Sequence, residues 1–406
     1  MPITLSGTRI RVEYEVGDPK GNSWGQAFNM ADVIAASDAG GWGCTVIDQV
    51  YSIPYTLYIA GAETYFSISA YSSLQSMVVI FCATAPTDVY QLWQTEGSHI
   101  KIGTFTANYV YPVYIIVSTV VPSVSRRVVM LQDVNCYNVV FNNIQYFYIY
   151  GTEAFPSIVQ NVITQNIPFG LATDQYVTLD NVQSFGGSYG LTVNGWASAK
   201  NLFVKTHQYG LIIPALNVIA RNVNVEDSVI ADTFQRCGNS EGKKAYFIDS
   251  KIDKSKMWWY TSGSYAFENK NEQFLQTTMS IYVRDEEGSD LDAANIKVYG
   301  SEDTLLLDTD TINGEALDNI VTYFTTWRTL DASQQIIDED SIDYEPFRIV
   351  ISKSGYKDTI INGLTVMPGD PTNIHVSMTQ PTYAEPPEVT VIEEPTTIAI
   401  IEVETE

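Results

Sequence analysis

The segments Gln160-Asn161-Val162, Asp180-Asn181-Val182, Lys200-Asn201-Leu202 and Arg221-Asn222-Val223 carry an asparagine at the same place in four successive stretches of the chain. These asparagines recur every 20 or 21 residues. A repeat of this length is typical of architectures in which one small unit stacks on the next, because no unit can bury its apolar face alone. The repeat therefore predicts a stacked architecture for this part of the chain.

A glycine keeps the same phase as the asparagines. It follows the first three of them by nine residues, in Phe169-Gly170-Leu171, Tyr189-Gly190-Leu191 and Tyr209-Gly210-Leu211. In the fourth repeat Ala231 takes the place of the glycine. An earlier and less regular turn is expected at Asn142-Asn143-Ile144. Two markers in phase indicate a structural repeat rather than chance similarity.

Short stretches with alternating apolar residues lie between the markers, and they have the period of strands. Strands and tight turns within about 20 residues predict one coil of a parallel β-helix. Stacked coils place equivalent residues about 4.8 Å apart. We therefore expect inward-facing asparagines to pair their amides between coils, and the glycines to supply left-handed or bulged backbone. The predicted structural ladder consists of Asn161, Asn181, Asn201, Asn222, Gly170, Gly190 and Gly210.

The repeat resembles the right-handed parallel β-helix superfamily, which includes pectate-lyase-like enzymes and many fibre and tailspike proteins of tailed phages. The resemblance is to an architecture and covers residues 40–275. Residues 45–130 are apolar and rich in tyrosine but keep a weaker phase. Before the repeats, Trp24–Ala36 is the best helical candidate, with Phe28, Val33 and Ile34 on one face and Gly40-Gly41 ending it. We expect this helix to cap the open end of the solenoid.

The chain changes character after residue 277, where longer alternating strands with acidic turns begin. They predict a small antiparallel β-sandwich. The segments Asp285…Gly288, Ala294–Val298, Asp310…Gly314 and Gly355-Tyr356 resemble a carboxypeptidase-regulatory-like domain of the transthyretin type. An insertion around Trp327–Tyr344 departs from that pattern. The resemblance implies a module for display or adhesion rather than chemistry.

Four regions follow from these patterns. We expect an N-terminal strand and capping helix at 1–40, a parallel β-helix at 41–277, a transthyretin-like or Ig-like β-sandwich at 278–380 and an acidic Pro/Glu-rich tail at 381–406. Within the tail, Thr396–Glu404 has the pattern of a strand. This strand is expected to complete the sheet edge of a neighbouring subunit or to meet a basic patch on another protein.

Composition limits the classes of partner. The chain has 406 residues and a net charge of −25, so it repels nucleic-acid phosphates and anionic membranes. Its beginning lacks the features of a secretory signal, and no apolar run is long enough to span a bilayer. The chain has four cysteines that are not closely spaced in the sequence, namely Cys44, Cys82, Cys136 and Cys237. We expect them to be buried thiols of a protein made in a reducing cytoplasm. The three histidines form no metal pattern with them, and no cofactor motif is present.

One group of ionisable residues is close enough together in the predicted repeat to be a candidate active site. The group lies on adjacent coils and consists of Lys205, His207, Glu226, Asp227 and Asp232. The repeat places Lys205 within one step of Glu226. The alternative interpretation is that these residues form ion pairs on a solvated surface. We prefer this alternative, in which none of them is catalytic. The acidic motifs that the pectin hydrolases use are missing from the sequence. A calcium ion is a further candidate ligand at Asp338, Asp340 and Asp343.

These observations favour a structural protein of a virus particle, made in the host cytoplasm and without enzymatic activity: a fibre, spike, decoration or head-associated protein of a tailed phage. Its partners would be other virion proteins, further copies of itself, with a trimer favoured by the resemblance, and a glycan on a host surface. Two alternatives stay open: a β-helix polysaccharide hydrolase or lyase such as a tailspike depolymerase, and a cell-surface adhesin or surface-layer protein. Tyrosines such as Tyr114, Tyr146 and Tyr148 are expected on an outer face against another chain.

Overall fold

Strands dominate the chain. The computed structural model describes residues 2–61, 63–69, 77–81, 90–94, 98–103, 113–117, 128–132, 134–173, 176–193, 198–213, 217–236, 243–260, 272–330 and 336–381. Among these residues α1 (Met30–Gly40) is the one α-helix, which confirms the predicted all-β class. No helix in the described ranges is long and apolar enough to cross a membrane. The chain forms two compact units, Met1–Ala245 with Ser255–Asn271 and Tyr246–Lys254 with Glu272–Glu406.

The first unit contains α1 and most of the strands. Its first half consists of β1 (Ile3–Ser6), β2 (Arg9–Glu13), the 3₁₀ turn η1 (Trp24–Gln26), β3 (Phe28–Asn29), β4 (Thr45–Ile47), β5 (Val50–Ile53), β6 (Thr56–Ala60), β7 (Tyr65–Ile68), β8 (Met77–Phe81), β9 (Tyr90–Gln94), β10 (His99–Gly103), β11 (Val113–Val117) and β12 (Val128–Gln132). Its second half consists of β13 (Val134–Asn142), β14 (Tyr146–Tyr150), β15 (Ser157–Gln165), β16 (Leu171–Thr173), β17 (Val177–Val193), β18 (Ser198–Ile213), β19 (Val218–Glu226), β20 (Ala231–Arg236) and β22 (Met257–Tyr260). The boundary between the units falls within β21 (Lys244–Ile248) and the 3₁₀ turn η2 (Lys254–Lys256).

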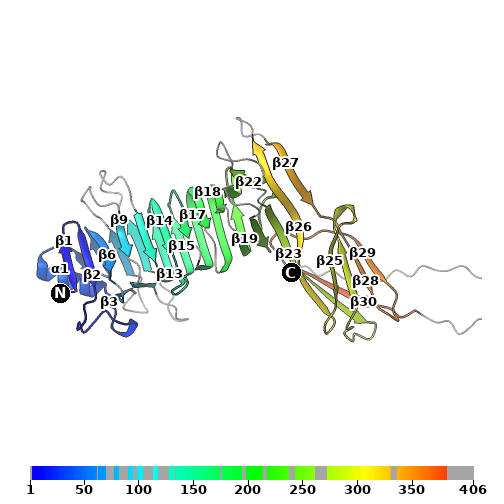
Figure 1. The fold of residues 1–406 in the computed structure, drawn as a ribbon, viewed down its shortest axis with the longest axis horizontal. Helices are drawn as coiled ribbons and strands as arrows, with labels where there is room; N and C mark the ends of the chain where they lie inside the picture. Colours follow the sequence, from blue (N-terminus) through cyan, green and yellow to red (C-terminus); the bar gives the residue numbers. More distant parts are fainter. Residues whose placement is uncertain are drawn as a thin grey trace, which may run out of the picture. The chain divides into compact units, whose positions relative to one another are not determined.

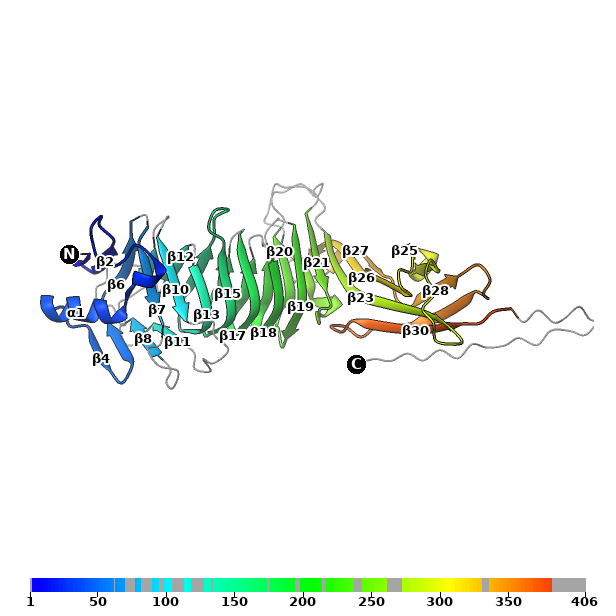
Figure 2. The ribbon, with the colours of Figure 1, turned by 90° about the horizontal axis from the view of Figure 1, so that it is seen from below.

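Most strands of the first unit pair in parallel with a strand one repeat further along the chain. Figures 1 and 2 show β13, β15, β17, β18 and β19 side by side in this way. In the second half the register joins Thr178 to Ser198, at the spacing that the asparagines predict. In the first half it joins His99 to Tyr65, a much longer step. The longer repeats explain why residues 45–130 keep a weaker phase.

The asparagine marker forms a left-handed corner in every repeat of the second half. Asn161, Asn181, Asn201 and Asn222 have φ between 51° and 57°. The strand pairing passes over each of them, joining Gln160 to Asp180 and Val162 to Val182 but leaving out the asparagine between. Asparagine enters this conformation more readily than other residues with a side chain, because its short polar side chain bonds locally. The corner explains why this residue type recurs.

A further asparagine belongs to the same corner. Asn138 has φ 54° and lies level with Asn161, because Tyr137 pairs with Gln160 and Val139 with Val162. The earlier turn was expected around Asn143, and that prediction was displaced by one corner. Asn143 lies in a second row of left-handed residues, five positions further along each repeat. This row consists of Asn143, Asn166, Gly186, Thr206 and Asp227, with φ between 53° and 69°.

The interior of the first unit is a stack of apolar side chains in register. Val162, Val182, Leu202 and Val223 follow one another through β15, β17, β18 and β19, and each is at most 1% exposed. Cys136 is also buried in β13, and burial raises the pKa of its thiol well above the usual range. Cys44 is buried as well, whereas Cys82 and Cys237 lie outside the described residues.

The N-terminal helix begins six residues later than the sequence pattern predicts. Trp24 lies in η1, and Phe28 lies in β3, where it pairs with Phe66 rather than facing out from a helix. Asn29 forms a capping box: its Oδ1 accepts from the backbone N–H of Ala31 at 2.9 Å, and Asp32 Oδ2 accepts from the N–H of Asn29 at 3.0 Å. These bonds fix the start of α1, since they satisfy donors of the first turn. The helix ends at Gly40, as expected, followed by a left-handed Gly41.

The second unit contains two sheets. Its elements are β23 (Glu272–Asp285), β24 (Asn295–Tyr299), the 3₁₀ turn η3 (Ser301–Asp303), β25 (Leu305–Asp310), β26 (Glu315–Leu330), β27 (Ile336–Asp343), β28 (Phe347–Ser352), β29 (Thr359–Leu364) and β30 (Thr372–Met378). One sheet has the order β25-β24-β28-β29 and is antiparallel throughout. In the other, β23 pairs with β26 antiparallel but with β30 in parallel, so the expectation of purely antiparallel strands was wrong.

Side chains from both sheets form one buried cluster in the second unit. Ile281 of β23 and Ile374 of β30 come from one sheet, and Ile296 of β24 and Phe347 of β28 from the other. Each of these four side chains is at most 1% exposed. The alternation of buried and exposed residues along β24 and β28 follows the strand period, which aims one face of each sheet at the cluster.

Candidate functional site

Three of the five candidate catalytic residues meet on the surface of the first unit. The register of β18 and β19 places Lys205 directly beside Glu226, as the repeat predicts. Lys205 Nζ lies 3.0 Å from Glu226 Oε2 and 3.6 Å from Asp227 Oδ2. The hydrogen bond to Glu226, together with the charges of both carboxylates, raises the pKa of Lys205 above its usual value. A lysine held in this way stays protonated and does not serve as a base near neutral pH.

The other two candidates face the interior. His207 is 1% exposed and Asp232 is 4% exposed, so the preferred interpretation of ion pairing on a solvated surface was wrong for these two side chains. The physical reason is the left-handed corner at Thr206, which lies between outward-facing Lys205 and inward-facing His207. Asp232 accepts a hydrogen bond from the hydroxyl of Ser228. The five residues therefore form a surface ion pair and separate interior contacts, not one reacting centre.

His207 lies beside a polar side chain in the interior of the first unit. Its Nε2 is 3.3 Å from Ser184 Oγ, while its Nδ1 has no hydrogen-bond partner among the described residues. Burial lowers the pKa of His207, although backbone groups of Ser184 and Gly187 partly oppose the shift. The ring is therefore neutral at pH 7, and it is closed off from any substrate on the surface.

The asparagine corners carry hydrogen bonds between repeats. Asn181 Nδ2 donates to Asn161 Oδ1 at 2.8 Å, and Asn222 Nδ2 donates to Asn201 Oδ1 at 2.8 Å. Between these two pairs, Asn201 Nδ2 turns instead to Asp180 Oδ1 at 2.8 Å. Asn181, Asn201 and Asn222 are exposed, so the expectation that they face inward was wrong. Water competes for these bonds, and the left-handed backbone is the stronger reason for asparagine here.

The glycine marker is required for close stacking. A Cβ on Gly190 would overlap the carbonyl oxygen of Gly210 and a methyl group of Val204, and a Cβ on Gly210 would lie 2.6 Å from the carbonyl oxygen of Asp232. Only Gly170 of the three has a left-handed φ, at 66°. Of the two predicted roles, left-handed backbone is therefore wrong for Gly190 and Gly210, and bulged backbone stays a prediction. Their role is to let one repeat approach the next.

Aromatic side chains form rows on the outside of the first unit. In β14 the buried Phe147 and Ile149 alternate with the half-buried Tyr146, Tyr148 and Tyr150. The rings of these tyrosines are parallel within 4°, with centroids 6.4 Å and 6.1 Å apart. A second row crosses the repeats and consists of Tyr146, Phe169, Tyr189, Tyr209 and Phe234, with neighbouring centroids 4.5–6.0 Å apart. The predicted outward direction of the β14 tyrosines is confirmed, and a contact with another chain stays a prediction.

The calcium candidate is not assembled by the described residues. The side chains of Asp338 and Asp340 lie outside what the structure describes, and Asp343 accepts from Lys254 Nζ at 2.9 Å. Within the described ranges, no three His, Cys, Asp or Glu side chains gather closely enough to hold a metal ion. Asp343 therefore belongs to an ion pair of the second unit.

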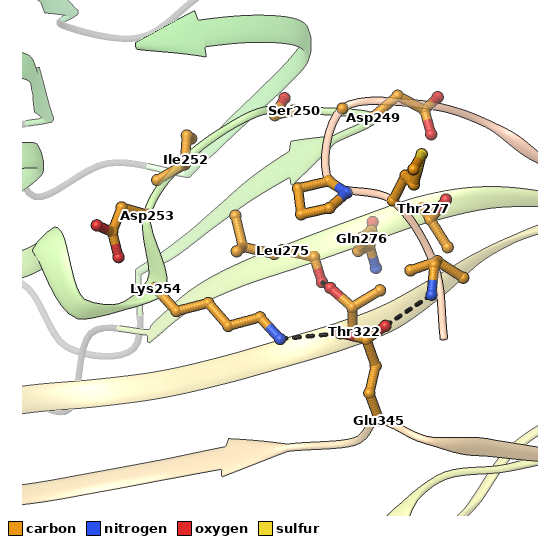
Figure 3. Close-up of a pocket in the computed structure, with 14 residues that line it drawn as sticks. Asp249, Ser250, Ile252, Asp253, Lys254, Leu275, Gln276, Thr277, Thr322 and Glu345 are labelled. Carbon is orange, nitrogen blue, oxygen red and sulfur yellow. Dashed lines mark hydrogen bonds and ion pairs between the residues drawn. The ribbon is translucent and has the colours of Figure 1, made fainter. Parts of the chain in front are cut away.

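Lys254 of that ion pair also lines a pocket of about 280 Å³ within the second unit. Figure 3 shows the amine of Lys254 extending directly towards Glu345, with Leu275 and Thr322 beside this contact and Asp249 and Ser250 farther from it. Lys254 Nζ lies 2.9 Å from Glu345 Oε2, and Glu345 Oε1 accepts from the backbone N–H of Val366 at 2.8 Å.

Burial opposes the charge on Lys254, but the hydrogen bonds to Glu345 and Asp343 outweigh burial and raise the pKa of the amine. Asp249 is bonded in turn to the backbone N–H and the hydroxyl of Thr278, both at 2.6 Å. The charged groups around this pocket thus hold parts of the second unit together. This arrangement has no signal in the sequence, because Lys254 and Glu345 are 91 residues apart.

No protein-family profile matches the sequence of this chain, and no curated protein matches it either.

Proposed function

We propose that this chain is a structural and attachment protein of a virus particle of the tailed-phage kind, built as a right-handed parallel β-helix with a helical cap and a following β-sandwich. The parallel register of β13 to β20 supports the β-helix, because each strand meets its equivalent one repeat later. Two left-handed corners in each repeat supply the turns that such a coil needs. The position of α1 next to β1 and β3 supports the cap.

The single observation that carries the proposed role is the arrangement around Lys205. The one constellation that the sequence offered as an active site is divided by the corner at Thr206, with Lys205 neutralised by Glu226 outside and His207 enclosed inside. A polysaccharide depolymerase would need an accessible acid and base that converge on one bond. The geometry of these five residues favours a supporting role over catalysis.

The second unit fits a display module. Two sheets around one apolar cluster, with charged residues at their turns, agree with the resemblance to a transthyretin-type domain. The outward tyrosine row of β14 gives the first unit a surface of the composition that protein interfaces favour. We propose that copies of the chain associate, with three as the favoured number, and that the acidic tail after Pro381 contributes to the contact. The tail itself lies outside the described residues.

Three measurements test the proposed role. Mass spectrometry of particles purified from the source culture should find the chain in constant proportion to the other particle proteins, and its absence would contradict the proposal. Light scattering should find an oligomer that weakens when residues 380–406 are deleted; a monomer in both cases with equal melting temperatures would remove the assembly role. Incubation with a panel of capsular and cell-wall polysaccharides should give no cleavage. Cleavage that Glu226→Ala or Asp232→Ala abolishes would establish the enzyme instead.

A further inference from the structure

A hollow lies among the outward aromatic side chains of the first unit. It has a volume of about 230 Å³ and is bordered by Tyr146, Tyr148, Phe169, Tyr189 and Thr192. Ala172 and Ile212 also form part of its lining, and Ile212 is only 2% exposed. The hollow is separate from the ion pair of Lys205 and from the pocket of the second unit, since it shares no residue with either.

The register explains how the hollow arises. Tyr148 of β14 pairs with Ala172 of β16, Ala172 pairs with Thr192 of β17, and Thr192 pairs with Ile212 of β18. These positions therefore form one line that crosses four strands. Along this line the large ring of Tyr148 is followed by the single methyl group of Ala172. The surface is therefore lower between Tyr148 and Ile212. Alternation of a large and a small side chain along a packed surface produces a slot one repeat wide.

The walls of the slot favour a flat ligand with a polar rim. Phe169 is 37% exposed and stacks on Tyr146, with centroids 4.5 Å apart and planes within 4°. The hydroxyls of Tyr146, Tyr148, Tyr189 and Thr192 can each donate or accept a hydrogen bond. Among the described residues that line the slot, none has a charged side chain. A site that combines aromatic carbon with a few hydroxyls fits a neutral, hydroxyl-bearing ring.

We infer that this slot binds one neutral sugar ring of a surface glycan, with the carbon face of the ring against Tyr148 and its hydroxyl edge towards Thr192. This inference rests on the proposed attachment role and names its ligand. A pyranose carries C–H groups on its faces and hydroxyls around its edge, which matches the two kinds of wall. The volume is below that of pockets for drug-sized ligands, which suits a single sugar ring. The net charge of −25 disfavours anionic glycans and nucleic acids.

Saturation-transfer NMR on the full chain tests the inference with four free sugars: glucose, galactose, mannose and N-acetylglucosamine. We expect at least one to bind, and Ala172→Leu, which fills the slot, to abolish that binding. Tyr148→Ala should weaken it about tenfold, since it removes the stacking ring. The matched control is Tyr150→Ala, which removes a parallel tyrosine of the same strand that does not line the slot and should bind as the unaltered chain does.

Binding of none of the four sugars would overturn the inference. So would an equal loss in Tyr150→Ala and Tyr148→Ala, or equal binding of N-acetyltyrosine amide, which would make the slot a general apolar hollow. Ala172→Ser keeps the side chain small and should retain binding, so it decides the matter if Tyr148→Ala does not fold. Failure of sugar binding would leave the particle and light-scattering results unchanged, so the two proposals are tested separately.

Discussion

The two units bury their apolar side chains in different ways. In the first unit an apolar residue meets its equivalents one repeat away, as Val182 meets Val162 and Leu202. In the second unit residues far apart in sequence meet in one cluster, as Ile281 of β23 meets Ile374 of β30. A stacked unit shares its stability among neighbouring repeats, whereas a single cluster is a cooperative whole. Substitutions should therefore act locally in the first unit and globally in the second.

The largest effect is expected from the cluster of the second unit. Phe347→Ala removes a fully buried ring and should lower the free energy of unfolding by about 3–5 kcal/mol. Hydrogen exchange should show lost protection throughout β23, β24, β28 and β30 while β17 and β18 keep theirs. Ile360→Ala, at a residue that is 53% exposed, is the control and should change little. Equal loss of protection in β17 would contradict the comparison.

A smaller and more local effect is expected from the stacking glycines. Gly190→Ala places a methyl group against Gly210 and Val204 and should destabilise the first unit by about 1–3 kcal/mol through overpacking. Hydrogen exchange should increase most in β17 and β18. Gly25→Ala is the matched control, because nothing lies within 4 Å of the added methyl group. If both substitutions had the same effect, close stacking would not be the reason for the glycine.

The asparagine corner should contribute less than a buried ladder would. Asn181→Ala keeps a side chain but disfavours the left-handed backbone, so it should cost about 1–2 kcal/mol. Asn181→Gly allows that backbone and removes only the exposed hydrogen bond to Asn161, so its cost should be a few tenths of a kcal/mol, about that of a capping residue replaced by glycine. Thermal melting of the two variants separates the contributions. A larger loss in the glycine variant would make the amide pair the main term.

The smallest effect concerns pH. Burial lowers the pKa of His207 below its ordinary value of 6.5, so the unfolded chain takes up this proton more readily than the folded chain. The stability of the first unit should therefore fall as the pH drops below 6.5 and should be fully present above it. His207→Phe should reduce the slope of melting temperature against pH in this range. An unchanged slope would show that other groups cause any acid sensitivity.

The sequence revealed those parts of the fold that repeat a residue type. The asparagine spacing predicted the register of Lys205 beside Glu226, because one side chain suits that corner in every repeat. The second corner was predicted only at Asn143, since Asn166, Gly186 and Thr206 share a backbone conformation but no chemistry. The start of α1 was missed because apolar spacing suggested Trp24, whereas the capping bonds of Asn29 decide where the first turn forms.

The candidate site shows the same limit. Alternation of side chains along a strand predicts which residues are exposed, but a left-handed corner restarts the alternation, and His207 turns inward after Thr206. The slot beside Tyr148 is lined by residues from several strands. A single alanine such as Ala172 makes no recognisable pattern in the sequence. The contact between Lys254 and Glu345 depends on tertiary structure alone. Local patterns therefore predict corners and pairings better than they predict sites.

The short step between repeats also bears on the order in which the chain folds during synthesis. From β15 to β20 every parallel pairing joins residues 20 to 22 positions apart, as in Ser157 with Val177 and Tyr209 with Ala231. Closing such a loop costs little entropy, and contacts that are local in sequence form quickly. Each new repeat can thus dock on the previous one soon after it leaves the ribosome. The second unit must wait until β30 has been made, because β23 pairs with it.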